Sequence, residues 1–226
     1  MQLDFSFCII TDNSSEACLR IVEVIKSIRN LNIENYEILV IGGEGNKFIG
    51  SNKDLKKIDF DETQQRGWIT KKKNDIAKIA KYDNLVIMHD YFVFHYNWYQ
   101  GYLKILDRFE NCDLCLNPVQ MIDGRREFTD WVTYDHPVYG LHGSVPYVDE
   151  SNVKHQYFSG GYFVVKKDFF LANPLDEKLL AHQEEDVEWS LRIRDTANVI
   201  FNPYSVVRHN KTHRNQKIDV WTRMII

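Results

Sequence analysis

The hydrophobic positions of the first forty residues alternate between continuous runs and a periodic stripe. Residues 5–10 and 36–41 are apolar runs rich in β-favouring side chains, which is typical of buried strands. Between the runs, apolar residues recur with the period of a helix, and Asn13 and Glu16 have the spacing of a capping box at its start. The residues of this stripe are Cys18, Ile21, Val22, Ile25 and Ile28.

The same alternation continues up to residue 90. Residues 57–60 predict a third strand, residues 68–81 a helix, and residues 85–88 another apolar strand. This order of strands and helices indicates an α/β fold, in which helices flank a mostly parallel, Rossmann-like central sheet. Ligands of such folds bind at the carboxyl ends of the strands.

The second half of the chain has a weaker pattern. Residues 122–156 are polar and aromatic, and Pro and Gly break every period, so we expect a long functional or mobile loop there. The other elements predicted in this half are helices over 96–109 and 185–194 and strands over 113–118, 162–165, 199–201 and 205–208.

The size and composition of the chain narrow the functional classes. With 226 residues it is long enough for one full core and short for two, so we expect a single domain. A net charge of −4 is too acidic for a general nucleic-acid binder. No apolar run reaches the length of about 18 residues that spans a membrane, and the first residues lack the charge of a secretory signal. We therefore expect a cytoplasmic protein.

The cysteines agree with a reducing compartment. Cys8 lies in an apolar run and Cys18 on the helical stripe, where small buried thiols are common. Cys112 and Cys115 have a metal-like spacing, but no second pair or nearby histidine accompanies them. We interpret them as part of a buried strand.

Two predicted strands end in side chains that bind divalent cations. His89 and Asp90 follow the run at 85–88, and His209 follows the run at 205–208. A Mg²⁺ or Mn²⁺ ion bound to a diphosphate needs few protein ligands, and an imidazole favours Mn²⁺. We expect Asp90 and His209 to be metal ligands on neighbouring strands. The alternative is that each polar residue only marks where a strand leaves the core.

A run of three lysines opens the helix predicted at 68–81. Positive charge at a helix start is disfavoured by the helix dipole, by about 0.3–1 kcal/mol for each residue. A phosphate bound near Thr70, Lys73 and Asn74 would remove this cost, because helix N–H groups and a lysine both bind it. A solvated run of charges explains the lysines equally well.

The acidic residues Glu184, Glu185 and Asp186 begin the next predicted helix. One of these carboxylates could deprotonate an attacking hydroxyl group, although acidic residues at a helix start also act as caps. Gly160 and Gly161 precede the strand at 162–165 and either allow close approach to a ligand or form a plain turn. The glycine patterns of dinucleotide, P-loop and serine hydrolase sites are absent from the sequence.

In their order and spacing, these motifs resemble those of the GT-A glycosyltransferases, in particular the inverting family 2 type, over nearly the whole chain. Two departures are Met88, in place of the first aspartate of Asp-x-Asp, and Gly43 with Glu44, where the second strand usually ends in aspartates. The residues that carry the resemblance are 5–11 with Asp12 (first strand and nucleotide loop), Lys73 and Asn74 (start of the helix before the metal strand), His89 and Asp90 (Asp-x-Asp), Gly160 and Gly161 (donor sugar), Glu185 and Asp186 (base), and His209 (after the last strand).

The resemblance implies one GT-A domain, in which residues 1–118 bind the nucleotide and residues 119–226 hold the donor sugar and acceptor. It implies a nucleotide-diphosphate sugar donor, with UDP expected, a carbohydrate or other hydroxyl acceptor, and Mn²⁺ or Mg²⁺ as cofactor. Asp186 would deprotonate the acceptor with Glu185 in reserve, while the metal and Lys73 stabilise the leaving diphosphate. The expected donor-binding residues are Thr11, Asp12, Gly43, Glu44, Thr70, Lys73, Asn74, His89, Asp90, Gly160 and Gly161.

Two other functions stay open. A non-catalytic nucleotide-sugar binding protein would explain Met88, but it has no use for a base at Asp186. A sugar nucleotidyltransferase would usually carry a Gly-rich, Arg-containing loop after the first strand, which residues 11–14 do not offer. We expect the acceptor to bind at 122–156, alone or with a second subunit. The basic residues at 208–217 form either a lid over the diphosphate or a solvated tail.

Overall fold

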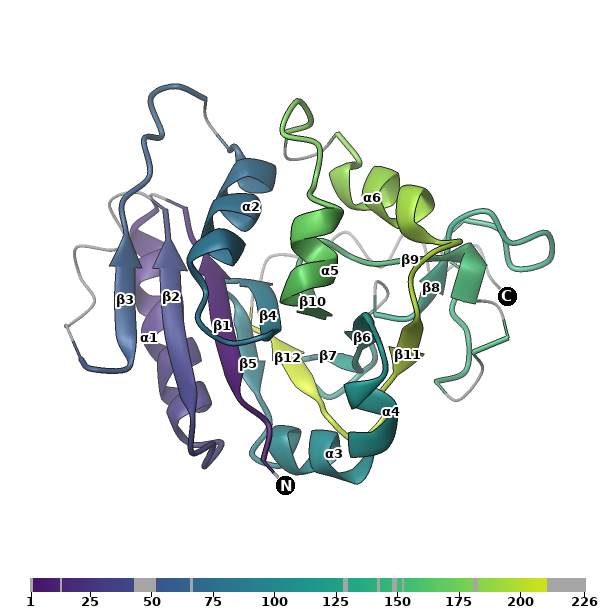
Figure 1. Ribbon diagram of the computed structural model, residues 1–226, viewed down its shortest axis with the longest axis horizontal. Helices are drawn as coiled ribbons and strands as arrows, with labels where there is room; N and C mark the ends of the chain where they lie inside the picture. Colours follow the sequence, from purple (N-terminus) through teal and green to yellow (C-terminus); the bar gives the residue numbers. More distant parts are fainter. Residues whose placement is uncertain are drawn as a thin grey trace.

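A seven-stranded sheet runs through the centre of the protein (Figure 1). The computed structural model describes residues 2–12, 14–42, 52–65, 67–127, 130–141, 143–147, 150–151, 153–180 and 183–210. β10 runs antiparallel to both of its neighbours, whereas the other adjacent pairs are parallel, so the predicted mostly parallel sheet is confirmed. From edge to edge, the strands are β11 (Val199–Phe201), β6 (Leu114–Leu116), β10 (Tyr162–Lys166), β4 (Asn84–His89), β1 (Phe5–Ile10), β2 (Tyr36–Ile41) and β3 (Leu55–Ile58).

Helices cover both faces of this sheet, and Figure 1 shows α1 behind it and α2 and α5 in front. Side chains of β1 alternate between the two cores, with Phe5, Phe7 and Ile9 on one face and Cys8 and Ile10 on the other. Burial of both faces explains why β1 is a nearly continuous apolar run. One face carries α1 (Ser15–Arg29), α3 (Trp98–Lys104) and α4 (Leu106–Glu110), and the other carries α2 (Ile69–Ile79), α5 (Lys167–Ala172) and α6 (Glu185–Ile193).

The start and the buried face of α1 differ from the prediction. Ser14 is the N-cap, and its hydroxyl accepts a hydrogen bond from the Ala17 N–H at 3.1 Å. Asn13, the predicted cap, lies outside the described residues. Val22 is 53% exposed, while Val24 is fully buried. The buried stripe advances by three and four residues, and this spacing places Val22 beyond its edge.

The helix predicted at 96–109 is two helices, α3 and α4, because the backbone at Ile105 is not helical. On the two sides of this break, Tyr102 and Phe109 both pack against Phe5, with ring centroids 5.5 and 6.0 Å apart. The strands predicted at 5–10, 36–41 and 199–201 are present with the predicted ends, and the other predicted elements are present with shifted ends. Of the helices that the structure describes, none combines the length and the apolar character that a membrane crossing requires.

The last strand, β12 (Val207–His209), does not lie beside β4 as predicted. It joins a separate three-stranded sheet, between β5 (Phe92–Phe94) and β7 (Val119–Met121). The prediction is wrong because both edges of β4 are already paired, with β1 and β10. His209 still comes near the end of β4, since it pairs with Phe92, and the Asn210 N–H donates to the Tyr91 carbonyl at 2.8 Å.

The segment at 122–156 is largely irregular, as predicted, and a buried carboxylate holds it together. Asp130 accepts hydrogen bonds from Arg126 Nε (2.7 Å), the Tyr147 hydroxyl (2.5 Å) and the Trp131 N–H (2.7 Å). Burial raises the pKa of Asp130, and Arg126 and Tyr147 oppose that shift by stabilising the charged form. Two short strands, β8 (Val132–Thr133) and β9 (Gln156–Tyr157), pair here, and a 3₁₀ turn (Val153–His155) leads into β9.

At Gly101, α3 packs closely against the segment that leads into β12. A methyl group on Gly101 would lie 2.3 Å from the Ser205 hydroxyl oxygen and 2.7 Å from the Tyr204 carbonyl oxygen. We expect Gly101→Ala to lower the free energy of unfolding by about 1–3 kcal/mol, although alanine usually stabilises a helix relative to glycine. Denaturant unfolding measures the effect, with Gln100→Ala at an exposed position of α3 as the control. Equal stability of the two variants would contradict this packing.

Candidate functional site

One edge of the main sheet brings together residues from distant parts of the chain. β1, β2 and β4 end side by side there, because Ile10 pairs in register with both Ile41 and His89. β10 runs the other way and starts at the same edge, where the Gly161 carbonyl accepts a hydrogen bond from the His89 N–H at 3.0 Å. This is the edge at which the predicted fold binds its ligands.

Asp90, directly after β4, is a buried carboxylate at this edge. Its Oδ2 accepts a hydrogen bond from the Thr11 hydroxyl at 2.7 Å. Arg20 on α1 approaches side-on, with Nε 3.3 Å from Oδ1 and Nη2 3.1 and 3.3 Å from the two oxygens. Burial raises the pKa of Asp90, and the Thr11 hydrogen bond and the Arg20 charge act in the opposite direction. These contacts tie β1, β4 and α1 to one another.

This arrangement does not fit the metal ligand that the sequence predicts at Asp90. A carboxylate has about four lone-pair sites, and the contacts of Thr11 and Arg20 use them. A divalent cation at Asp90 would also lie against the Arg20 guanidinium, whose charge repels it. Within the described ranges, no three His, Cys, Asp or Glu side chains gather as a metal-binding group. In this structure the partner of Asp90 is therefore an arginine.

His209, the other predicted metal ligand, packs among aromatic rings. Its ring centroid lies 4.7 Å from that of Tyr91 and 5.5 Å from that of Phe92. Tyr91 in turn stacks on His89 at 5.4 Å. The pairing of β12 with β5 thus brings His209 to the loop that follows Asp90, in an aromatic environment.

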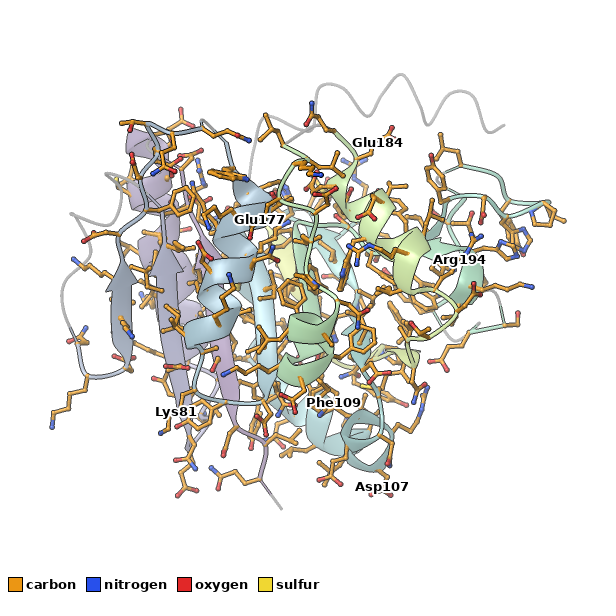
Figure 2. All side chains as sticks on the ribbon, turned by 45° about the horizontal axis from the view of Figure 1, so that its top comes forward. Lys81, Asp107, Phe109, Glu177, Glu184 and Arg194 are labelled. Atoms are coloured by element: carbon orange, nitrogen blue, oxygen red, sulfur yellow. The ribbon has the colours of Figure 1, made fainter. Side chains whose placement is uncertain are left out.

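Two polar residues at the start of α2 hold the segment between α5 and α6. The Thr70 hydroxyl donates to the Leu179 carbonyl at 2.9 Å, and the Asn74 amide exchanges hydrogen bonds of 2.9 and 3.1 Å with the Leu175 backbone. Figure 2 shows Glu177, from this segment, against α2. Thr70 and Asn74, which we expect at a phosphate from the sequence, here fix the chain that leads into α6.

Lys73 is a buried ammonium group, not part of a solvated charge run. Its side chain exposes no surface, and the Glu185 Oε1 atom lies 3.8 Å from its Nζ. No hydrogen-bond partner of this Nζ lies in the part of the chain that the structure describes. Burial lowers the pKa of Lys73, while the charges of Glu185 and Asp186 raise it. Because an ammonium in such surroundings costs stability, its presence favours a functional role.

Gly160 brings a backbone N–H group against the carboxylates of α6. This N–H donates to Asp186 Oδ2 at 2.8 Å. A methyl group on Gly160 would lie 2.8 Å from Lys73 Nζ and 3.1 Å from Glu185 Oε1, so these side-chain ends would have to shift. Glu184, the residue before α6, has a left-handed backbone (φ 56°, ψ 38°), which is uncommon outside glycine. Figure 2 shows Glu184 and Arg194 at the two ends of α6, so this cluster belongs to the start of the helix.

The sequence does not identify Arg20 or the ion pair that Lys72 forms with Glu62. Arg20 has an ordinary helix partner in Glu16, four residues earlier, and this hides its long-range contact. Arg20 also lies beyond the first turn of α1, where the helix dipole acts, so no signal in the local sequence marks it. Lys72 forms an ion pair with Glu62 and donates to the Thr11 carbonyl at 3.2 Å. The predicted residues Gly43 and Glu44, and the tail from residue 211, lie outside the described residues.

Comparison with known proteins supports the fold. No family model and no curated protein matches the sequence. S. aureus TarS 1-349 is similar in structure, with a TM-score of 0.59, 13% identity, and 90% of this chain and 60% of that chain covered. For the same protein with UDP-GlcNAc, the TM-score is 0.62 and the identity is 14%, with 93% of this chain and 59% of that chain covered. For GalNAc-T7 with UDP, GalNAc and Mn²⁺, the TM-score is 0.62 and the identity is 16%, with 92% of this chain and 43% of that chain covered.

These identities are low, so the likeness concerns the fold, and this chain spans 60% or less of the length of each protein. The neighbours are glycosyltransferases with domains of the GT-A type. The predicted fold class, an α/β domain of GT-A type with a mostly parallel sheet flanked by helices, is thereby confirmed.

The buried pair of Arg20 and Asp90 predicts a large loss of stability when the arginine is removed. The two side chains are 13% and 5% exposed. We expect Arg20→Met to lower the free energy of unfolding by about 3–5 kcal/mol at neutral pH, because Asp90 is left buried without its counter-charge. In the variant, the Thr11 hydrogen bond still opposes the effect of burial, but the charge of Arg20 no longer does, so the pKa of Asp90 lies further above the unfolded value. The penalty then shrinks as the pH falls through the folded-state pKa, and it is gone below about pH 4.

Arg29→Met is the matched control for this measurement. Arg29 lies on the same helix and pairs with Asp54 at 2.8 Å, but these side chains are 35% and 23% exposed. An exposed pair contributes about 1 kcal/mol or less. Unfolding experiments across pH compare the two variants. Equal losses of stability, or a loss for Arg20→Met that does not depend on pH, would show that the pair of Arg20 and Asp90 contributes no more to stability than the exposed pair does.

Proposed function

We propose that this protein transfers a sugar from a nucleotide-diphosphate donor to a hydroxyl acceptor, with inversion at the anomeric carbon. The observation that carries the proposal is the convergence of Gly160, Lys73, Glu185 and Asp186 at the ligand-binding edge of a GT-A type fold. Structures of similar proteins hold UDP, UDP-GlcNAc, or UDP with GalNAc. A UDP sugar is therefore the donor that we propose.

The nucleotide is proposed to bind where β1 and β2 end, within residues 1–118. Thr11, Asp12 and Gly42 lie there, and a methyl group on Gly42 would be 2.3 Å from the Thr11 carbonyl oxygen. The backbone of Gly42 (φ 139°) also favours glycine, so the two loops can approach closely. Gly43 and Glu44 follow directly in the sequence and remain predicted nucleotide contacts. The donor sugar would then lie over Gly160 and Gly161, at the start of the second half.

Asp186 is the proposed base, and Glu185 supports it. Glu185 is buried and paired with Lys73 Nζ, whereas Asp186 is partly exposed and is oriented by the Gly160 N–H. Asp186 can therefore accept the proton of an acceptor hydroxyl group. As that proton leaves, the acceptor oxygen bonds to the anomeric carbon and the bond from this carbon to the diphosphate oxygen breaks. A single displacement of this kind inverts the anomeric carbon.

The acceptor is proposed to be a carbohydrate or another hydroxyl compound that binds near the segment at 122–156, alone or with a second subunit. This segment leads through β9 directly to Gly160, so it lies next to the proposed donor sugar along the chain. The predicted Mn²⁺ or Mg²⁺ is not assigned to Asp90, because Thr11 and Arg20 occupy its carboxylate. GalNAc-T7, a protein of similar fold, was crystallised with Mn²⁺.

Release of UDP from UDP-GlcNAc and UDP-GalNAc, with and without candidate acceptors, tests this function. We expect Asp186→Asn to keep its affinity for UDP while turnover falls by a factor on the order of 10² to 10⁴, because the base is lost and the donor contacts are not. Glu188→Gln is the control, since Glu188 lies in the same helical turn but pairs with Arg192 at 2.7 Å. UDP binding without release in the wild-type protein would favour a non-catalytic binding protein. Unchanged turnover in Asp186→Asn would move the base elsewhere.

Gly160→Ala tests whether the carboxylates of α6 need the close approach of the backbone. The added methyl group would press on Lys73 Nζ and Glu185 Oε1 and so displace the Asp186 contact. We expect turnover to fall by about 10²-fold, as a shift of about 1 Å at a reacting group can cause. Gly161→Ala is a comparison within the same donor-sugar loop: its methyl group would meet the Phe92 ring, at 3.2 Å, and none of the carboxylates, so a smaller loss of turnover is expected there. Full activity of a folded Gly160→Ala variant would exclude this role of the loop.

A further inference from the structure

Arg20 uses only part of its guanidinium group to bind Asp90. Nε and Nη2 contact the carboxylate at 3.1–3.3 Å, whereas Nη1 makes no hydrogen bond within the described part of the chain. The carboxylate that Nη1 approaches is that of Glu16, at 3.7 Å, and the Glu16 side chain is 70% exposed. The two N–H donors of Nη1 are thus available to a ligand, on a group that its other side holds in place.

Asp90 also connects this guanidinium to the proposed nucleotide loop. Its Oδ2 atom accepts hydrogen bonds from both the Thr11 hydroxyl and Arg20 Nη2, at 2.7 and 3.3 Å. Thr11 is the first residue after β1. The Asp90 carboxylate therefore links Arg20 to the loop at which we place the nucleotide.

The three carboxylates near Arg20 differ in how strongly they interact with its charge. Asp90 is buried together with Arg20, so the two form an enclosed ion pair. Asp12 and Glu16, at 3.9 and 3.7 Å, are 61% and 70% exposed, so water and salt screen them. A divalent cation could bind Asp90 only by displacing Arg20, and the displaced guanidinium would repel it at short range.

We propose that Arg20 is the cation of the donor site and takes the place of a divalent metal ion at Asp90. This inference rests on the proposed function, because it concerns the leaving group of the same reaction. Nη1 donates hydrogen bonds to the diphosphate of the donor, while Nε and Nη2 stay on Asp90. A guanidinium is suited to this role, since it stays charged and binds phosphate oxygens through charge-assisted hydrogen bonds. The negative charge that develops when the diphosphate leaves then lies beside a fixed positive charge.

The test compares the affinity of the full chain for UDP in EDTA and in Mn²⁺, measured by isothermal titration calorimetry. We expect the wild-type protein to bind UDP equally well in both buffers. We expect Arg20→Met to bind UDP about 10- to 100-fold more weakly in both, as the loss of a charge-assisted hydrogen bond causes, and Arg20→Lys to lose less. Arg29→Met, which removes an arginine from the same helix but leaves Asp90 paired, should bind like the wild type.

A loss of wild-type affinity of about tenfold or more when EDTA replaces Mn²⁺ would overturn the inference in favour of a metal-dependent site. Unchanged affinity of a folded Arg20→Met variant would also overturn it, since the guanidinium would then not contact the diphosphate. If Arg20→Met does not fold, the wild-type comparison decides alone. Sugar transfer that depends on Mn²⁺ would keep the proposed function and reject the role of Arg20. Absence of UDP binding in both buffers would count against the proposed function itself.

Discussion

The burial of the Asp90 carboxylate is the constraint on which the rest of the site depends. A carboxylate buried at the end of a central strand needs hydrogen bonds and a counter-charge. β1 supplies the first through Thr11, and α1 supplies the second through Arg20. Three elements that are separate in the sequence therefore fix one another at the edge where ligands of this fold bind. Because Asp90 holds Nε and Nη2 of Arg20, the guanidinium is held in an orientation that suits a phosphate group.

A second buried charge organises the side of the site that belongs to α6. The Lys73 ammonium lies without exposed surface between α2 and α6, where Glu185 and Asp186 offset part of the cost of its burial. Thr70 and Asn74 hold the segment that leads into α6, and Gly160 lets a backbone N–H reach Asp186. The position of the proposed base thus depends on residues of α2 that need no contact with the substrate.

Much of the fold follows from the sequence, because buried strands and amphipathic helices leave periodic patterns such as those of β1 and α1. Asp90, Gly160, Glu185 and Asp186 could be proposed as site residues because each lies at the end of an element. The partner of Asp90 could not, because Arg20 lies seventy positions earlier on a helix that offers it a local partner in Glu16. The neighbour of β12 could not either, since pairing depends on which edges of β4 are already occupied.

In the proposed reaction, one edge of the sheet holds the sugar donor between Arg20 and Asp186. A crystal structure of the protein with an unreactive analogue of UDP-GlcNAc tests this placement. We predict that a diphosphate oxygen lies within hydrogen-bond distance of Arg20 Nη1, and that the sugar lies over Gly160 with its anomeric carbon toward Asp186. A nucleotide bound away from Thr11 and Arg20, or a sugar turned away from Asp186, would contradict this placement.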